Sequence, residues 1–316
     1  MKRAAKKILD SHSILVVSHK RPDGDSIGSQ LGLISGLKKM EKKVLCLNED
    51  PVPEMFSFLR NSRSIKNTSV IKFSPDLIIC LDISNLERTG ERIFSFLKDS
   101  HSFKLNIDHH VSNEYFGDMN IVDTNASSTS ELVYDLLVNL DVDISRDIAE
   151  PLLAGIVTDT GSFRFSNVTA KTLRCAAYLL EKKADISRIS TEVYMSKPLS
   201  KVRLSSKVLE RMEIIADKSF SYLLSDDFKS YNAKMEYTEG LVNEILNIQG
   251  INFAVLLTEE SKNFCRLSFR SKDKKYDANK FAEKFDGGGH KFAAGGRLKE
   301  KAEIALKKLK RELINL

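Results

Sequence analysis

Between Ser13 and about Ala184 the sequence alternates short apolar runs with segments that carry apolar residues at helical spacing. The runs cover residues 14–17, 44–47, 76–81, 103–107 and, more weakly, 119–122, and the helical segments between them include 26–40 and 87–97. Strand and helix in alternation predict parallel strands joined by right-handed crossovers. We therefore expect an α/β domain with helices on both faces of a parallel sheet.

Acidic and imidazole side chains follow these runs directly. His19 follows the first run, Asp82 the third and the segment 108–110 the fourth. Because ligand sites in open parallel sheets collect at the carboxyl ends of the strands, we expect these side chains to share one crevice. An unpaired carboxylate beside a buried strand is costly, so Asp82 needs a metal or an Arg such as Arg88, unless it is a helix N-cap.

The loop after the first run holds three candidate ligands, His19, Asp23 and Asp25. Pro22 is expected to stiffen this loop and Gly24 to allow a tight bend. A helix from Ser26 would add free N–H groups that favour a phosphate oxygen. An exposed turn followed by an N-cap is the alternative for this segment.

The segment Asp108-His109-His110 allows one ring to ligate a metal and the other to meet a substrate, while the acid orients them. A buried structural pair of histidines is the alternative. Asp159 follows the apolar segment 152–157 and is either a turn residue or a further ligand.

Together, His and Asp ligands without thiolates favour Mn²⁺, with Mg²⁺ or Co²⁺ as substitutes, over structural zinc. Six ligands exceed the needs of one catalytic ion and suit two ions that share a carboxylate, roughly 3.5 to 4 Å apart. Such a pair ionises a water and stabilises charge on a phosphoryl group. Phosphoester hydrolysis is therefore the predicted reaction class.

The rest of the chain predicts a second domain. Ser128 with Glu131 suggests a capping box, and residues 186–212 are compatible with a helical connector. Strands are expected at 220–224, 251–258 and 264–269, and helices at 237–248, 277–285 and 302–313. The expected division is a catalytic domain at 1–185, a connector at 186–212 and a smaller mixed α/β domain at 213–316.

Charge and composition limit the function classes. Residues 1–185 hold 24 Lys and Arg against 25 Asp and Glu, whereas residues 186–316 hold 25 against 18. A basic second part suits an anionic substrate, although a solvated Lys-rich surface is the simpler explanation. The four scattered cysteines are expected to be core thiols. With no membrane-length apolar stretch and no secretory signal, a cytoplasmic protein is expected.

These motifs, together with Gly287-Gly288-Gly289-His290, resemble the DHH phosphoesterase superfamily with its DHH-associated C-terminal domain, in the nanoRNase and pAp (3′-phosphoadenosine-5′-phosphate) phosphatase group. The resemblance implies that His19 and Asp23 hold one Mn²⁺, that Asp25, His109 and Asp159 hold the other, and that Asp82 bridges them. His110 would contact the scissile phosphate as an acid. The implied clamp on a terminal phosphate consists of Arg270, Ser271, Gly287, Gly288, Gly289 and His290. Homodimers are also implied.

The first functional hypothesis is hydrolysis of very short RNA and linear dinucleotides to nucleoside monophosphates, with dephosphorylation of pAp. A cyclic dinucleotide phosphodiesterase, acting above all on cyclic di-AMP, is the alternative within the enzymes. The 287–290 segment argues against a related pyrophosphatase. A non-catalytic single-strand RNA binder is the alternative from another class. Stacking of Phe163 or Phe165 on a base is also considered, beside simple packing.

Overall fold

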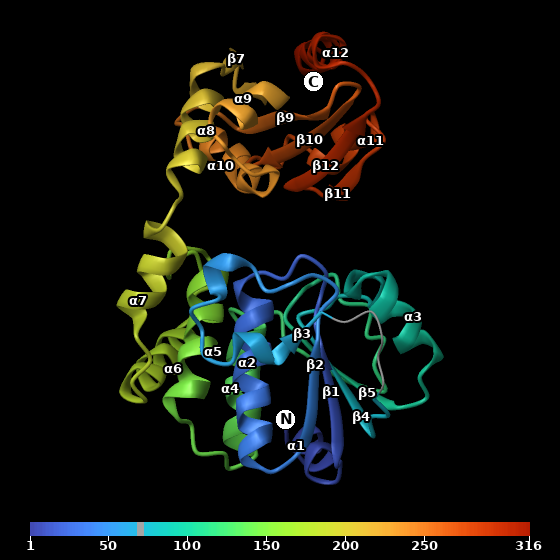
Figure 1. Cartoon of the computed structure of the whole chain (residues 1–316), viewed down its shortest axis with the longest axis vertical. Coiled ribbons are helices and arrows are strands. Elements are labelled where there is room, and N and C mark those ends of the chain that lie inside the picture. Colours follow the sequence, from blue (N-terminus) through green and yellow to red (C-terminus); the bar gives the residue numbers. More distant parts are fainter. Residues whose placement is uncertain (68–72) are drawn as a thin grey trace. The chain divides into compact units, whose positions relative to one another are not determined.

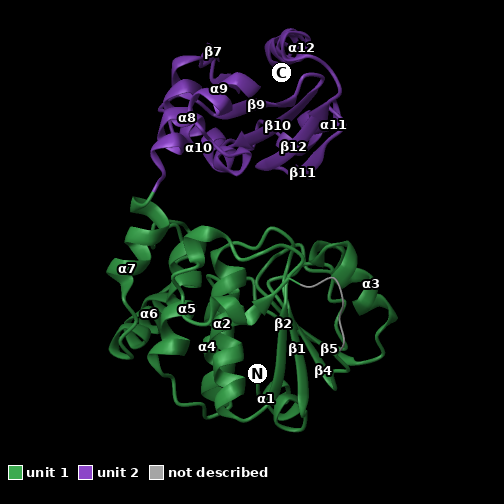
Figure 2. Cartoon of the chain, viewed as in Figure 1, with its two compact units in different colours: residues 1–196 green, residues 197–316 purple. Residues whose placement is uncertain are grey.

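The structure is a computed structural model that describes residues 1–67 and 73–316. The chain forms two compact units, Met1–Ser196 and Lys197–Leu316 (Figure 2). The division falls inside the segment 186–212 that was expected to connect two domains. Within that segment lie α7 (Ile186–Ser190), a π-helical turn at Thr191–Met195 and all of α8 (Leu199–Glu210). Pro198 is extended, and α8 begins directly after it.

Unit 1 is built on a six-stranded parallel sheet in the order β3-β2-β1-β4-β5-β6 (Figure 1). The strands are β1 (Ser13–Val17), β2 (Lys43–Leu47), β3 (Ile65–Lys66), β4 (Leu77–Leu81), β5 (Phe103–Asp108) and β6 (Met119–Val122). All five predicted strands are confirmed, and β3 was not predicted. The strand order reverses between β1 and β4, which is where such sheets bind ligands.

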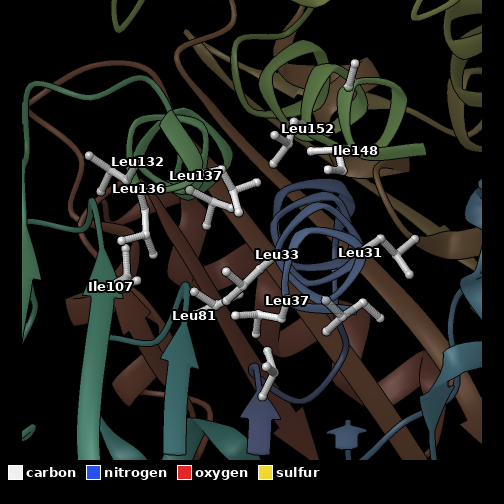
Figure 3. Close-up of a cluster of buried hydrophobic side chains, with 14 of the residues drawn as sticks. Leu31, Leu33, Leu37, Leu81, Ile107, Leu132, Leu136, Leu137, Ile148 and Leu152 are labelled. Carbon is white, nitrogen blue, oxygen red and sulfur yellow. The ribbon is translucent and has the colours of Figure 1, made fainter. Parts of the chain in front are cut away.

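Helices cover both faces of this sheet, as predicted. They are α1 (Lys2–Leu9), α2 (Gly24–Lys39), α3 (Glu91–Asp99), α4 (Thr129–Asn139), α5 (Arg146–Asp159) and α6 (Ala170–Glu181), with short 3₁₀ turns at Glu54–Phe56, Ser62–Ser64 and Leu86–Thr89. Along β4, Ile79 and Leu81 join the core under α2, α4 and α5, whereas Ile78 and Cys80 join the core under α3. Burial on both faces explains why the parallel strands are continuous apolar runs. Figure 3 shows leucines of α2 and α4 over the ends of β4 and β5.

Glycines at every fourth position of α2 let α5 and, at Gly36, α4 pack closely against it. The glycines are Gly24, Gly28, Gly32 and Gly36. A Cβ on Gly28 would lie 2.4 Å from the carbonyl oxygen of Pro151 and 2.8 Å from the backbone nitrogen of Gly155. A Cβ on Gly24 would overlap Thr158. Gly24 therefore serves close helix packing rather than the tight bend expected for it, and the packing brings the start of α2 against the end of α5.

Unit 2 is a mixed sheet in the order β11-β12-β10-β9-β8-β7, in which only β8 and β9 are parallel. The strands are β7 (Glu213–Ile215), β8 (Lys218–Leu223), β9 (Phe253–Ser261), β10 (Phe264–Ser271), β11 (Gly288–His290) and β12 (Ala293–Leu298). The helices besides α8 are α9 (Ser225–Ser230), α10 (Leu241–Leu246), α11 (Ala278–Glu283) and α12 (Ala302–Ile314), with a 3₁₀ turn at Met235–Thr238.

Unit 2 differs from the sequence prediction in several features, since β7, β12 and α9 were not predicted and two further segments differ as follows. The helix expected at 237–248 starts only at Leu241, because Gly240 is left-handed with φ +82° and separates α10 from the preceding 3₁₀ turn. The segment 287–290, which no predicted strand covers, contributes the edge strand β11.

The four cysteines are buried and free, and burial raises the pKa of each thiol. None of the helices formed by residues 1–67 and 73–316 has both the length and the hydropathy of a membrane span.

Candidate metal centre

Three strand ends bring the predicted side chains together at the point where the strand order reverses. His19 follows β1 by two residues, Asp82 follows β4 directly, and Asp108 is the last residue of β5. The neighbours β1, β4 and β5 are hydrogen-bonded in parallel, so their carboxyl ends share one edge. The expected convergence of these residues is therefore present in the fold.

Asp82 lies at the centre of this group and is 2 % exposed. Its Oδ2 lies 3.4 Å from His19 Nε2, and its Oδ1 lies 3.7 Å from His109 Nε2 and 3.6 Å from His110 Nδ1. The backbone of Asp82 is left-handed, with φ +59°. Such a conformation is costly for a residue other than Gly and is characteristic of functional sites. Imidazoles, rather than Arg88, surround this carboxylate.

Three sets of side chains can each surround an ion. One set is His19, Asp23 and Asp82, the second is Asp25, His109 and Asp159, and the third is Asp82, His109 and His110. Within each set the donor atoms lie within 4.8 Å of one another. Asp82 and His109 each belong to two sets, so the first two sets are contiguous. All six side chains expected as ligands are therefore gathered.

Helix ends position the acids that do not follow strands. Asp23 is the N-cap of α2 and accepts a hydrogen bond from the Ser26 N–H, so the helix begins before Ser26, and this N–H is not free for a phosphate. Asp159 is the last residue of α5 and lies 3.5 Å from His109 Nε2. An acid at the C-terminal end of a helix opposes the helix dipole and favours a positive partner.

The N-terminus of α4 holds Asp25, which is 1 % exposed. The Thr129 N–H donates to Asp25 Oδ2 at 2.6 Å, and the Ser130 N–H donates to Oδ1 at 2.8 Å. Ser128 caps the same helix by accepting from the Glu131 N–H, as predicted. The Glu131 carboxylate does not complete the predicted capping box, because its Oε2 accepts from Ser127 and Thr172 instead.

The electrostatics of this group favour a bound cation. Burial, with repulsion from Asp82 and Asp159, raises the pKa of Asp25 well above its usual value. Burial also raises the pKa of Asp159 to about 6, against the lowering by His109. For His19, burial would lower the pKa, but the neighbouring carboxylates of Asp23 and Asp82 outweigh it and raise the pKa to about 10. Acids that resist ionisation and an imidazole that holds its proton both indicate excess negative charge.

Hydrogen bonds orient two of the imidazoles. His19 Nδ1 lies 2.8 Å from the Lys20 carbonyl oxygen, which directs Nε2 toward Asp23 and Asp82. His110 Nδ1 lies 2.7 Å from Asp108 Oδ1. Burial would lower the pKa of His110, but this hydrogen bond and the charge of Asp82 raise it. His110 is thus an imidazole with an acid behind it, an arrangement suited to proton transfer.

Asn113 and Thr129 belong to this site and were missed by sequence reasoning. Asn113 donates to Asp108 Oδ2 at 2.6 Å, and the Thr129 hydroxyl donates to Asp82 Oδ1 at 3.1 Å. Thr129 follows a predicted N-cap, and that signal alone could have drawn attention to it. Of the aromatic candidates, Phe163 packs against the core and Phe165 is 57 % exposed.

The residues expected as a phosphate clamp lie in unit 2. Arg270 pairs with Ala293 across β10 and β12, and Ala293 pairs with His290 across β12 and β11. Opposite residues of antiparallel strands share a face, so the side chains of Arg270 and His290 flank a small Ala. Ser271 follows Arg270 and therefore faces the other side of the sheet. Its hydroxyl donates to the Asp273 carbonyl oxygen, so the structure does not bring it to this face.

Two of the three glycines of this segment, Gly287 and Gly289, allow close strand contacts. A Cβ on Gly287 would lie 2.1 Å from the carbonyl oxygen of Gly295, and one on Gly289 would lie 2.6 Å from that of Ala293. Gly288 has open space around it and meets only Asn279 Oδ1, at 3.5 Å. Gly287 and Gly289 are therefore required for packing of β11 against β12.

Two family models match this chain. The model described as "DHH family, N-terminal domain" matches residues 13–156, and the DHHA1 domain model matches residues 220–315. The chain belongs to the DHH family. The family domain at 13–156 contains all the strand-end residues of the metal-centre candidate, whereas Asp159 lies just beyond it.

Known members of the DHH family are similar over nearly the whole chain. The bifunctional oligoribonuclease and PAP phosphatase NrnA of Bacillus subtilis is 32% identical over 90% of this chain and 89% of its own length. The protein of the same name from Thermus thermophilus is 33% identical over 90% of this chain and 84% of its own length. The crystal structure of an exopolyphosphatase-related protein from Bacteroides fragilis is 30% identical, covers 98% of this chain and 94% of its own, and has a TM-score of 0.91.

Proposed function

We propose that this protein is a divalent-metal-dependent phosphodiesterase that hydrolyses very short RNA oligonucleotides and linear dinucleotides to nucleoside monophosphates and dephosphorylates pAp. The similarity to NrnA proteins, whose names state oligoribonuclease and PAP phosphatase activity, supports this choice of substrates. The observation that carries the proposal is the position of Asp82, which groups with His19 and Asp23 on one side and with His109, a member of the second donor set, on the other. One shared carboxylate between two sets is the arrangement that a two-metal hydrolase requires.

The donor atoms fit two borderline-hard divalent ions, and we propose Mn²⁺, with Mg²⁺ or Co²⁺ as substitutes. His19 and Asp23 would hold one ion, Asp25, His109 and Asp159 the other, and Asp82 both. Bound there, the ions would supply an ionised water and neutralise charge on the phosphoryl oxygens. His110, oriented by Asp108, would face the scissile phosphate and donate a proton to the leaving oxygen.

The two units would have different functions, catalysis and substrate binding. Residues 1–185 would form the catalytic domain and residues 213–316 the substrate-binding domain, with 186–212 as the connector. Arg270 and His290 would bind the terminal phosphate, because the Arg270 guanidinium is half-buried and no ion pair joins it to a carboxylate of the described residues. A half-buried guanidinium that has no carboxylate partner is suited to binding phosphate oxygens.

Initial rates on linear pApA, five-nucleotide RNA, pAp, cyclic di-AMP and inorganic pyrophosphate would test the substrate class. We expect the linear substrates and pAp to be hydrolysed in Mn²⁺ and all activity to stop with a chelator. Fastest turnover of cyclic di-AMP would replace the proposed substrate, and fastest turnover of pyrophosphate would contradict it. RNA binding unaffected by chelator, without product, would indicate the non-catalytic RNA binder. Sedimentation of the same preparation would test the homodimer that the family resemblance implies.

Metal affinity should increase with pH. In the metal-free protein the pKa of His19 is about 10 and that of Asp159 about 6, so an ion must displace at least the His19 proton above pH 6, and the Asp159 proton as well below it. Each displaced proton makes the apparent affinity rise about tenfold per pH unit. We expect a slope of at least about one decade per pH unit between pH 6.5 and 8.5, measured by calorimetric Mn²⁺ titration. An affinity that stays constant over this window would contradict these protonation states.

Arg270→Ala should raise KM much more than it lowers metal affinity. Loss of charge-assisted hydrogen bonds to a phosphate costs about 1.5–3 kcal/mol, which is roughly a tenfold to hundredfold change. Arg266→Ala is the matched control, because Arg266 lies on the same strand, four residues away, and is paired with Glu260 at 2.9 Å. Equal effects of the two changes on KM, or loss of metal with Arg270→Ala, would exclude the clamp.

A further inference from the structure

Thr129 forms hydrogen bonds with two buried carboxylates of the metal-centre candidate, those of Asp25 and Asp82. Its backbone N–H donates to Asp25 Oδ2 at 2.6 Å, and its hydroxyl donates to Asp82 Oδ1 at 3.1 Å. Thr129 is itself fully buried, and so are its neighbours Ser128 and Ser130. Two hydrogen bonds from one residue therefore join Asp25, in the first turn of α2, to Asp82, which directly follows β4.

The position of Thr129 on α4 explains why both groups are available. Thr129 is the first residue of the helix, where backbone N–H groups have no partner within the helix. The first two N–H groups go to the oxygens of Asp25, and the third goes to Ser128. A threonine hydroxyl inside a helix usually bonds to the carbonyl four residues earlier, but no helical carbonyl precedes Thr129. Its hydroxyl is therefore free to donate to Asp82.

The hydroxyl determines how the Asp82 carboxylate is rotated. The oxygen that accepts from Thr129 is the one that faces His109 and His110, and the other oxygen faces His19. A carboxylate without this donor can turn about its Cβ–Cγ bond and present its oxygens differently. Groups that orient metal ligands typically contribute about 10–100-fold to metal affinity.

We propose that Thr129 is a positioning residue of the metal centre, which holds Asp25 and Asp82 at the separation and orientation that two ions need. This inference rests on the proposed function, since it assigns Thr129 a role toward ions that Asp25 and Asp82 would ligate. Thr129 touches neither substrate nor ion in this role. It acts through the two carboxylates, and metal affinity is therefore the direct measure of its effect.

The test is calorimetric titration of the metal-free, full-length chain with MnCl₂. Thr129→Val keeps the shape and the backbone N–H but removes the hydroxyl, and it should weaken Mn²⁺ binding about 10–100-fold. Thr129→Ser keeps the hydroxyl and should bind within about threefold of the unchanged chain, since it retains the same charge-assisted hydrogen bond. Where the valine variant does not fold, Thr129→Ala removes the same hydroxyl, and its loss of affinity must exceed that of Thr129→Ser.

Thr172→Val is the matched control. Thr172 is also fully buried, and its hydroxyl donates to a carboxylate, Glu131 Oε2, at 2.9 Å, but Glu131 is not among the candidate ligands. We expect this change to lower the thermal midpoint and to leave Mn²⁺ affinity unchanged. Equal losses of affinity in Thr129→Val and Thr172→Val would show a general packing effect and overturn the inference.

The outcomes separate this inference from the proposed function. If the unchanged chain binds two Mn²⁺ and Thr129→Val binds them equally well, the role of Thr129 is wrong while the two-metal hydrolase stands. If the unchanged chain binds no divalent ion, the proposed function fails, and the inference fails with it. Weaker binding by Thr129→Val, restored in Thr129→Ser, supports both.

Discussion

Asp82→Asn is expected to abolish phosphodiester hydrolysis, lowering the rate at least about 1,000-fold. The change removes several kcal/mol of transition-state stabilisation by the metal ions, and each 1.36 kcal/mol is a factor of about ten in rate. Asp82 is shared by two donor sets, so its charge would be lost from both. Asparagine is preferred to alanine here because Asp82 has φ +59°, and Asn tolerates the left-handed region better than most residues. The measurement is the initial rate on linear pApA, with Mn²⁺ stoichiometry on the same protein.

Asp143→Asn is the control for this prediction. Asp143 is an Asp of the same unit, its side chain is 78 % exposed, and its ion-pair partners among the described residues are surface lysines, so its loss should change neither rate nor metal content. Near-normal hydrolysis by Asp82→Asn would show that no ion depends on this carboxylate, and the proposed bridging role would be abandoned.

Gly28→Ala is expected to lower the free energy of unfolding by about 1–3 kcal/mol, the usual cost of inserting a methyl group into a tightly packed interior. The new Cβ would lie 2.4 Å from the carbonyl oxygen of Pro151 and 2.8 Å from the nitrogen of Gly155. Both are backbone atoms, which cannot turn away as a side chain can, so α2 and α5 must separate. Since these helices carry Asp25 and Asp159, Mn²⁺ affinity should fall as well. Denaturant unfolding and metal titration measure the two effects.

Gly295→Ala is the matched control, because a Cβ at Gly295 meets only the Leu267 carbonyl oxygen, at an ordinary 3.6 Å. We expect its free energy of unfolding to lie within about 0.5 kcal/mol of that of the unchanged chain, as is usual for substitutions at open surface positions. If Gly28→Ala were as stable as Gly295→Ala, the close approach of α2 and α5 would not be needed for the fold.

Most of the first unit could be predicted because its pattern is strong. Parallel strands buried on both faces must be apolar at every position, so β1, β4 and β5 stand out as runs, and the polar residue that ends each run is visible in the sequence. The short strand β3 and the edge strand β11 could not be predicted. They have two and three residues, and their pairing partners, rather than any local pattern, define them.

The residue types of the candidate site could be predicted from the sequence, but the groups that hold the candidate ligands in place could not. Asp25 is held by the N–H groups of Thr129 and Ser130, about a hundred residues away, and no local pattern encodes that contact. Ser271 shows the opposite case. It is adjacent to Arg270 in the sequence, yet the alternation of side chains along a strand directs it to the other face.

Hydrophobic periodicity and strand polarity are local properties of a chain, so the amino-acid pattern alone places acids and imidazoles at the ends of buried strands. The assembled fold sets how these side chains are grouped around Asp82, which oxygen of that carboxylate faces which imidazole, and how closely α2 approaches α5. Those features depend on backbone-to-backbone packing and on hydrogen bonds between distant segments, which arise only when the helices and the sheet are assembled.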